Sequence, residues 1–237
     1  MERRDHPFPC RVGRHRGARR MTIRVSPAGV RVTVPARARR ADVDAFLAAS
    51  RSWVADRLAE IPAAPALADG ARLALLDDAL TLAVSGRAGG GGRADRRDGR
   101  LEVRPAADGS LEGPVERWYR RCALAELDAR SRAVAAGLGR EVARVAVRDP
   151  RSRWGSCTTA GRLSFSWRLM LAPEHVLDYV VAHEVCHLVR PDHSPAFWRL
   201  LEEVRPGHDA ARRWLRENGE RLRLGPAWRS LSLDPSD

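Results

Sequence analysis

The feature that most constrains the fold is one segment, residues 173–188, whose pattern is that of a helix. Pro173 and Glu174 suit a first helical turn, because proline is preorganised there and a carboxylate interacts favourably with the helix dipole. Apolar residues then recur at helical spacing: Val176, Leu177, Val180, Val181, Val185 and Leu188. On this helix His183 and His187 are four residues apart, so their side chains rise from one face with Cβ atoms about 5–6 Å apart. The segment therefore predicts a packed helix that presents two histidines together.

Two imidazoles in this arrangement can bind one zinc ion, each at roughly 2.0–2.1 Å. Glu184 lies about 100° round the helix from His183, which makes it an awkward third ligand. It can instead reach a water molecule on the metal and accept its proton. We therefore predict His183 and His187 as metal ligands, Zn²⁺ as the cofactor and Glu184 as the catalytic base.

A hydrolytic zinc site usually has three protein ligands and one open position, and His193 is the favoured third ligand. It follows His183 by ten residues. Between them Pro191 disfavours the α conformation at Arg190, so the helix should stop there and the chain should turn back. The alternatives are a glutamate, as in thermolysin-type sites, or a later histidine: Glu202, Glu203 and His208.

The spacing of the three histidines is that of the metzincin signature. The chain departs from that signature at position 190, where the signature has glycine and this chain has Arg190, and no Met-turn is identifiable. The pattern therefore indicates a similar ligand geometry and not a metzincin fold. A histidine pair with this glutamate arises by chance in roughly 1% of such chains. The helical context and the third histidine favour a metal site over ordinary polar residues on an exposed helix.

Composition limits the class of protein. With 237 residues, 44% of them hydrophobic, the chain can bury a core in one domain or in two small ones. No apolar run is long enough to cross a bilayer, so we expect no membrane span. The basic first twenty residues are not followed by the apolar stretch of a signal peptide. Because the cysteines are scattered and form no C-x-x-C pair, we expect reduced thiols in a cytoplasmic protein: Cys10, Cys122, Cys157 and Cys186.

The net charge of +12 raises the possibility of a nucleic-acid partner. All the basic residues in that total are arginines, and alanine and glycine also abound, which is typical of a GC-rich coding bias. Such a bias raises the arginine content without any partner. A solvated surface is therefore the favoured interpretation of the charge, and nucleic-acid contact is the alternative.

The pattern of the chain predicts an α+β protein in two parts. Residues 1–20 are predicted to be a disordered basic leader, because they are charged and lack periodicity. Residues 21–110 are predicted to form a small amino-terminal α+β module. Its expected elements are a hairpin of strands 22–25 and 30–34, a helix over 41–59, strands 80–84 and 101–103, and a mobile Gly- and Arg-rich loop over 85–100 between those strands.

The second part, residues 111–220, carries the three histidines. We expect a long helix over 115–138, strands over 141–147 and 162–171 and a polar turn over 149–156 before the helix with the histidine pair. Residues 221–237 are assigned to a tail. The candidate site thus belongs to the second part alone.

Four stretches together resemble the YgjP-like metallopeptidase domain, which is similar to the WLM and SprT-type zinc peptidases. They are Arg-Ser-Arg-Trp-Gly-Ser-Cys at 151–157, Leu-Ser-Phe-Ser-Trp-Arg-Leu at 163–169, the segment 177–187 with the histidine pair, and His-Ser-Pro-Ala-Phe-Trp at 193–198. The resemblance covers nearly all the chain after residue 20. It implies a zincin-like α+β fold with residues 111–220 as the catalytic domain, zinc on His183, His187 and His193, Glu184 as catalytic base, and hydrolysis of a protein or peptide substrate.

The residues before the histidine helix permit two interpretations. In the functional one, the strand beginning at Arg162 runs beside that helix and binds an extended substrate by β-augmentation, and Arg153 or the backbone near Gly155 stabilises an oxyanion. In the structural one, Trp154 and Trp167 are core aromatics and Arg153 is a surface ion-pair partner. The sequence favours neither.

Two rival functions remain open. In one, a nucleic-acid-associated protein has a purely structural zinc, which requires a closed site with Cys157, Cys186 or another side chain as the fourth ligand. In the other, suggested by the SprT-type resemblance, a peptidase is recruited to DNA. Both differ from a simple zinc peptidase in predicting contact with nucleic acid.

Overall fold

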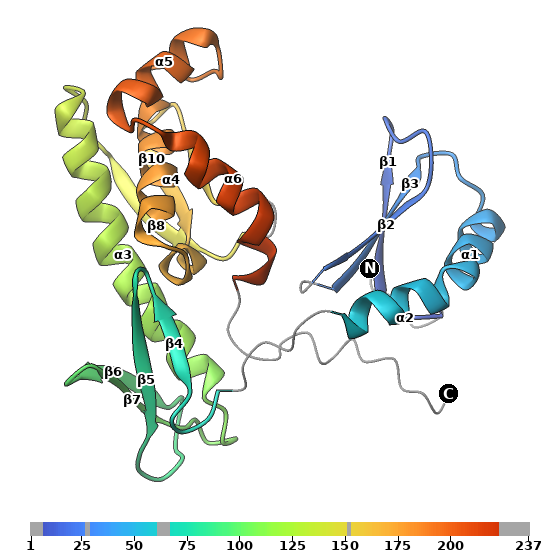
Figure 1. Cartoon of the computed structure of the whole chain (residues 1–237), viewed down its shortest axis with the longest axis horizontal. Coiled ribbons are helices and arrows are strands. Elements are labelled where there is room, and N and C mark those ends of the chain that lie inside the picture. The colour runs from blue at the N-terminus through green and yellow to red at the C-terminus, as the bar shows by residue number, and fades with distance from the viewer. Residues whose placement is uncertain (1–6, 27–28, 61–66, 151–152, 223–237) are drawn as a thin grey trace. The chain divides into compact units, whose positions relative to one another are not determined.

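The computed structural model describes residues 7–26, 29–60, 67–150 and 153–222 (Figure 1). The chain forms two compact units that divide near residue 65. Within the described residues, no helix combines the length and the apolar composition that crossing a bilayer requires. The predicted α+β class is confirmed, since each unit combines helices with a β-sheet.

The first unit is a three-stranded sheet with two helices. Its strands are β1 (Cys10–His15), β2 (Thr22–Ser26) and β3 (Gly29–Pro35), in the order β1-β3-β2. The predicted hairpin is present as the antiparallel pair β2–β3, and β1 adds in parallel to β3. One face of the sheet forms a core with the helices α1 (Arg40–Ala49) and α2 (Arg51–Ala59).

Two features of this unit differ from the sequence analysis. Residues 10–15, placed in the disordered leader, form β1, because their backbone pairs with β3 and the preceding Phe8 is buried at 1% exposure. The single helix expected over 41–59 is two helices separated at Ser50. The Ser50 hydroxyl donates to the Phe46 carbonyl at 2.7 Å, a bond that competes with regular helix geometry.

The second unit contains two sheets and the remaining helices. The strands β4 (Arg72–Leu75), β5 (Asp78–Val84), β6 (Arg93–Arg97) and β7 (Arg100–Arg104) form one sheet in the order β4-β5-β7-β6. The strands β8 (Arg144–Arg148), β9 (Gly155–Cys157) and β10 (Arg162–Ser166) form another in the order β8-β10-β9. The helices are α3 (Glu112–Gly137), α4 (Glu174–Cys186), α5 (Pro195–Val204) and α6 (His208–Asn218), with 3₁₀ turns at Trp167–Leu171 and Gly219–Arg221.

Strands in this unit are also placed differently from the prediction. The loop expected over 85–100 contains β6, whose Ala94 is buried at 1% exposure and which pairs antiparallel with β7. The strand expected over 162–171 ends at Ser166, where the hydroxyl accepts the Arg168 backbone N–H at 3.4 Å and starts a 3₁₀ turn. Residues 72–104, placed in the amino-terminal module, share one hydrophobic core with α3 and α4.

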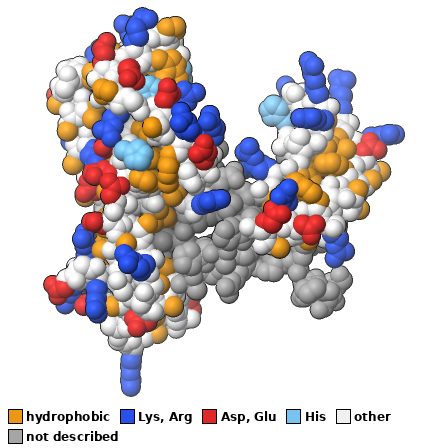
Figure 2. Space-filling model, in the orientation of Figure 1, with side chains coloured by type: hydrophobic (Ala, Val, Ile, Leu, Met, Phe, Trp, Pro, Cys, Tyr) orange, Lys and Arg blue, Asp and Glu red, His pale blue; other side chains and the backbone are white. Residues whose placement is uncertain are grey.

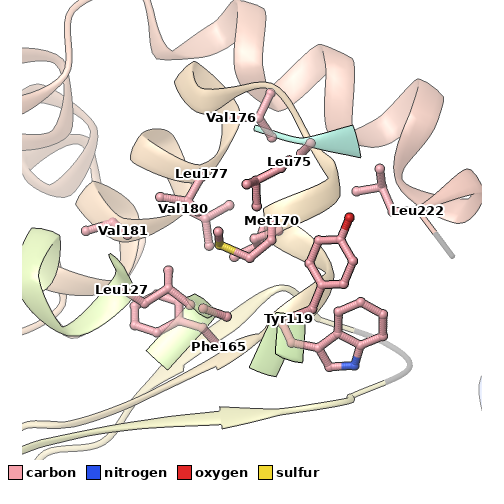
Figure 3. Close-up of a cluster of buried hydrophobic side chains, with 14 of the residues drawn as sticks. Leu75, Tyr119, Leu127, Phe165, Met170, Val176, Leu177, Val180, Val181 and Leu222 are labelled. Atoms are coloured by element: carbon pink, nitrogen blue, oxygen red, sulfur yellow. The ribbon is translucent and has the colours of Figure 1, made fainter. Parts of the chain in front are cut away.

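The helix that carries the histidine pair is fixed on two sides. Figure 3 shows Leu177, Val180 and Val181 of α4 gathered with Leu127 of α3 and Phe165 of β10 in the buried core. On its amino-terminal half, α4 is bound by Arg130 of α3, which donates to Glu174 at 2.6 Å and to Asp178 at 2.5 Å. Apolar burial and partly buried charge-assisted bonds therefore hold α4 in one position.

Candidate active site

Three histidines that are separated in sequence meet at the end of α4. His183 is on the last turn of α4, His187 is the residue that caps its carboxyl end, and His193 precedes α5. One nitrogen of each ring lies within 4.8 Å of the others. The Nε2 atoms of His183 and His193 are 3.0 Å apart. The structure thus brings together the three residues predicted as metal ligands.

Neighbouring groups orient the His187 ring and hold the backbone at His193. The Nδ1 atom of His187 is 3.0 Å from the Arg190 carbonyl oxygen, so Nε2 is its free nitrogen. The Trp198 indole N–H donates to the His193 carbonyl at 3.0 Å and holds the turn that carries this histidine. All three imidazoles pack around the buried Phe197, at ring-centroid distances of 5.0, 4.6 and 4.9 Å.

The arrangement fits a metal ion. Two nitrogens bound at 2.0–2.1 Å to one tetrahedral ion lie about 3.3 Å apart, close to the 3.0 Å between His183 and His193. Burial lowers the pKa of His183 to about 3, and the neighbouring His187 and His193 add to the effect. The ring is therefore neutral at physiological pH, which is the form that binds metals.

The alternative ligands lie elsewhere. Glu202 accepts the Gly207 backbone N–H at 3.1 Å, and its other carboxylate oxygen is 3.4 Å from His208. His208 packs between Tyr179 and Trp198, with ring centroids 6.0 and 5.8 Å away. Within the described part of the chain, the group that could hold a metal contains three histidines and no carboxylate or thiol. The candidates outside it are Glu202, Glu203, His208, Cys157 and Cys186.

Glu184 is buried beside this group, at 7% exposure, and lies against β9. A Cβ atom built on Gly155 of β9 would be 2.5 Å from Cγ and 2.6 Å from Oε1 of Glu184. Only glycine fits at this position, which explains its place in the motif at 151–157. Burial raises the pKa of Glu184 from 4.5 to about 7, although the positive charge of Arg153 opposes the rise.

The histidines and Glu184 open into a cleft of about 670 Å³, a size typical of ligand sites. Its walls come from β9 with its flanking residues 153–159, from α4, from the turn before α5 and from α6. Sequence reasoning missed several of these residues, because the helices that carry them meet only in the folded chain. The missed residues are Tyr179, Arg212, Leu215 and Arg216.

The sheet order excludes the substrate strand of the functional interpretation, one of the two that the sequence left open. The strand β10, which starts at Arg162, is the middle strand and has partners on both sides, so it cannot add another chain. The edge strand β9 contacts α4 and lines the cleft instead. Of the two tryptophans, Trp167 is a core residue at 2% exposure, whereas Trp154 borders the cleft together with Arg153.

Comparisons with known proteins identify the family of the chain. The family model described as YgjP-like, metallopeptidase domain matches residues 19–218. The chain belongs to this family. The resemblance found in the sequence is thereby confirmed, and metallopeptidase activity is the activity of the family.

Among solved structures, the chain is similar to the crystal structure of the metallopeptidase zymogen of Pyrococcus abyssi abylysin. The two share 22% identity over 42% of this chain and 98% of the other, with a TM-score of 0.35. No curated protein matched the chain.

The contact between Gly155 and Glu184 gives a first prediction. Because an alanine Cβ would collide with the carboxylate, we expect Gly155→Ala to displace Glu184 and to lower peptidase kcat by about 10²-fold, the usual effect of misplacing a reacting group by 1 Å. Gly137→Ala is the matched control, since nothing lies within 4 Å of its added methyl group. Steady-state kinetics of the two variants test the prediction, and equal activity would contradict it.

The raised pKa of Glu184 gives a second prediction, for the metal-free protein. Between pH 4.5 and about 7 the folded chain holds a proton on Glu184 that the unfolded chain has released. The stability from Glu184 is therefore present below pH 4.5 and is lost as the pH rises through 7. A shift from 4.5 to about 7 corresponds to at most about 3 kcal/mol.

Urea unfolding with a chelator present measures this effect as a difference between wild type and Glu184→Gln. The free energy of unfolding of the variant minus that of the wild type should increase between pH 4.5 and 8. His183 titrates in the opposite sense, but it is present in both proteins and cancels in the difference. A difference that stays constant with pH would show that Glu184 has an ordinary pKa.

Proposed function

We propose that this chain is a zinc-dependent peptidase in which His183, His187 and His193 hold the ion and Glu184 is the general base. The observation that supports it most directly is the meeting of three imidazoles beside one buried carboxylate in a cleft. Imidazoles are preferred zinc ligands, and three of them leave the open position that catalytic zinc sites keep. Protein or peptide chains are the proposed substrates.

A zinc ion, when bound, supplies Lewis acidity that polarises the scissile carbonyl and lowers the pKa of a water molecule toward about 7. Glu184 accepts the proton of the attacking water and later passes it to the leaving amine nitrogen. Burial raises the pKa of Glu184 to about 7, and the positive charge of a bound metal ion would lower it again, which would leave the carboxylate ionised and ready to accept the proton. Arg153, whose charge acts on Glu184, is the proposed partner of the negative charge on the carbonyl oxygen.

The peptide substrate is proposed to lie extended along β9. Gly155, Ser156 and Cys157 line the cleft, and within the described residues β9 pairs on one edge only, with β10. Its other edge has backbone donors and acceptors that suit an added strand. A strand of three residues gives few main-chain bonds, so side-chain contacts with the cleft must contribute to substrate affinity.

A structural zinc is the less supported alternative. It requires a fourth protein ligand, and the group found in the described residues has three. The thiols of Cys157 and Cys186 lie outside that group, so neither supplies the fourth ligand in this geometry. A cytoplasmic location is part of the proposal, since the cysteines are unpaired: Cys10, Cys122, Cys157 and Cys186.

Metal analysis and peptide cleavage test the proposed function together. The full-length protein is purified, its zinc content is measured by mass spectrometry, and its cleavage of an unfolded protein such as reduced casein is followed. We expect one zinc per chain, loss of cleavage after treatment with a chelator, and recovery when zinc is restored. Cleavage that persists in metal-free protein, or a zinc-loaded protein that cleaves nothing, would contradict the proposal.

A further inference from the structure

The first unit contains a segment with an unusual charge composition. Residues 7–40 contain ten arginines and no aspartate or glutamate, although the chain has 30 acidic residues among 237. At that average, about four acidic residues would be expected in a segment of this length. Acidic residues resume just outside the segment, at Asp5, Asp42 and Asp44, so the depletion is confined to the strands and the loops that connect them.

The sheet register places three of these arginines side by side. Arg11 of β1 is paired with Arg31 of β3, and Arg31 is paired with Arg24 of β2. Paired residues point to the same face of a sheet, and neighbouring strands are about 4.8 Å apart. The three exposed side chains therefore form one row across the whole sheet, which we call the arginine row. The row therefore concentrates three guanidinium groups on one face of the sheet.

The arginine row lies on the face opposite to the core. Val30, Val32 and Val34 of β3 are buried under α1 and α2. The alternate residues Arg31 and Thr33 point to the other side, as the two-residue period of a strand requires. Within the described residues of this unit, no helix covers that side, and Arg31 has no acidic partner there.

The next row on the same face is small and polar. It consists of Gly13, Thr33 and Thr22, which are paired with one another across the three strands. Threonine hydroxyl groups bind phosphate oxygens, and glycine allows close approach of a ligand. The loop between β1 and β2 adds further exposed arginines: Arg16, Arg19 and Arg20.

The acidic residues described in this unit are on its helices. Figure 2 shows arginine side chains over the strands and acidic side chains over α1 and α2. There they pair with local arginines, as in Arg39–Asp42 at 3.1 Å and Arg40–Asp44 at 3.6 Å. The charge of the helices is thus largely compensated within the helices, whereas the strands and their loop are cationic.

We infer that the arginine row and the adjacent threonine row form a binding surface for the phosphate backbone of a nucleic acid. Guanidinium groups bind phosphates in pairs of hydrogen bonds, and a row of them spans successive phosphates. The two rows contain no aromatic side chain, and His15 of β1 adds an imidazole further along the same face, so we expect the contact to be chiefly with the backbone and to depend little on base sequence.

A nucleic acid fits this face better than an anionic membrane does. Membrane-surface segments combine basic residues with apolar side chains that enter the lipid. The two rows contain arginine, threonine and glycine only. The large exposed apolar residues described in this unit are Val12, which is paired with Val32 and so points to the opposite face, and Trp53 on α2.

The test compares two triple variants of the full-length protein with the same change in charge. One replaces the arginine row (Arg11→Gln, Arg24→Gln, Arg31→Gln). The control replaces three exposed strand arginines of the other unit (Arg97→Gln, Arg100→Gln, Arg104→Gln). Binding of a fluorescent 20-base-pair DNA duplex of arbitrary sequence is measured by anisotropy at several salt concentrations. Thermal melting confirms that each variant folds. If the triple variant of the arginine row does not fold, the single variant Arg31→Gln replaces it.

We expect the row variant to weaken duplex binding more than about tenfold and to reduce the slope of log K against log salt by about three. The single variant Arg31→Gln should reduce that slope by about one. The control should change the affinity less than about threefold. Equal losses in the two triples, no duplex binding by the wild type, or binding only to vesicles of phosphatidylserine would overturn the inference. Because the readout is binding, its outcome is independent of peptidase activity.

Discussion

The variant Glu184→Gln is expected to retain one zinc per chain while its kcat for peptide cleavage falls by about 10²–10⁴-fold, the contribution usual for a general base. Glutamine has nearly the same size, so the contact with Gly155 is kept and the histidines remain in place. It cannot accept a proton from the attacking water, so the reaction loses its base. Single-turnover cleavage of a fluorogenic peptide, together with metal analysis, measures both quantities in one preparation.

The control for this variant is Glu203→Gln, an equivalent change on an exposed residue of α5 that lies outside the histidine group. It should leave both zinc content and kcat unchanged. If turnover survived in Glu184→Gln, Glu184 would be removed from the mechanism. If the variant lost its zinc, the carboxylate would act on the metal site and not as a base.

Much of the candidate site could be predicted because its geometry is local. Helical periodicity places His183 and His187 on one face whatever the rest of the fold does. Pro191 ends the helix soon afterwards, so His193 can return toward the pair. Glu184 lies next to His183 on the same helix. Predicting these residues therefore required no knowledge of distant segments.

The remainder of the site depends on contacts between distant segments. The strand β9 was expected to be a polar turn, because its three residues have no strand pattern and pair only through β10. Gly155 could not be assigned its role without the position of Glu184, nearly thirty residues later. The same reason explains why β1 was not predicted, because its partner β3 follows the intervening strand β2. Arg212 and Arg216 reach the cleft from α6, a helix that no motif connects with the histidines.

The second large effect is expected for His193→Ala, which should weaken zinc binding by more than 100-fold. Loss of residues that only support a metal ligand costs 10–100-fold in affinity, and His193 is proposed as a ligand itself. The residue is exposed in a turn before α5, so its removal should leave the metal-free fold intact, within about 0.5 kcal/mol. Competition with a zinc chelator of known affinity measures the first quantity, and urea unfolding without metal measures the second.

His175→Ala provides the matched control, because His175 is an exposed histidine on the same helix α4 and lies outside the group. It should keep wild-type zinc affinity. A 100-fold weaker site also lowers the zinc-dependent gain in unfolding free energy by about 2.7 kcal/mol, so a thermal melt with and without zinc gives an independent reading. If His193→Ala bound zinc as tightly as the wild type while Glu202→Gln lost it, the third ligand would be the glutamate. The turn at Pro191 would then serve to shape the cleft and not to complete the metal site.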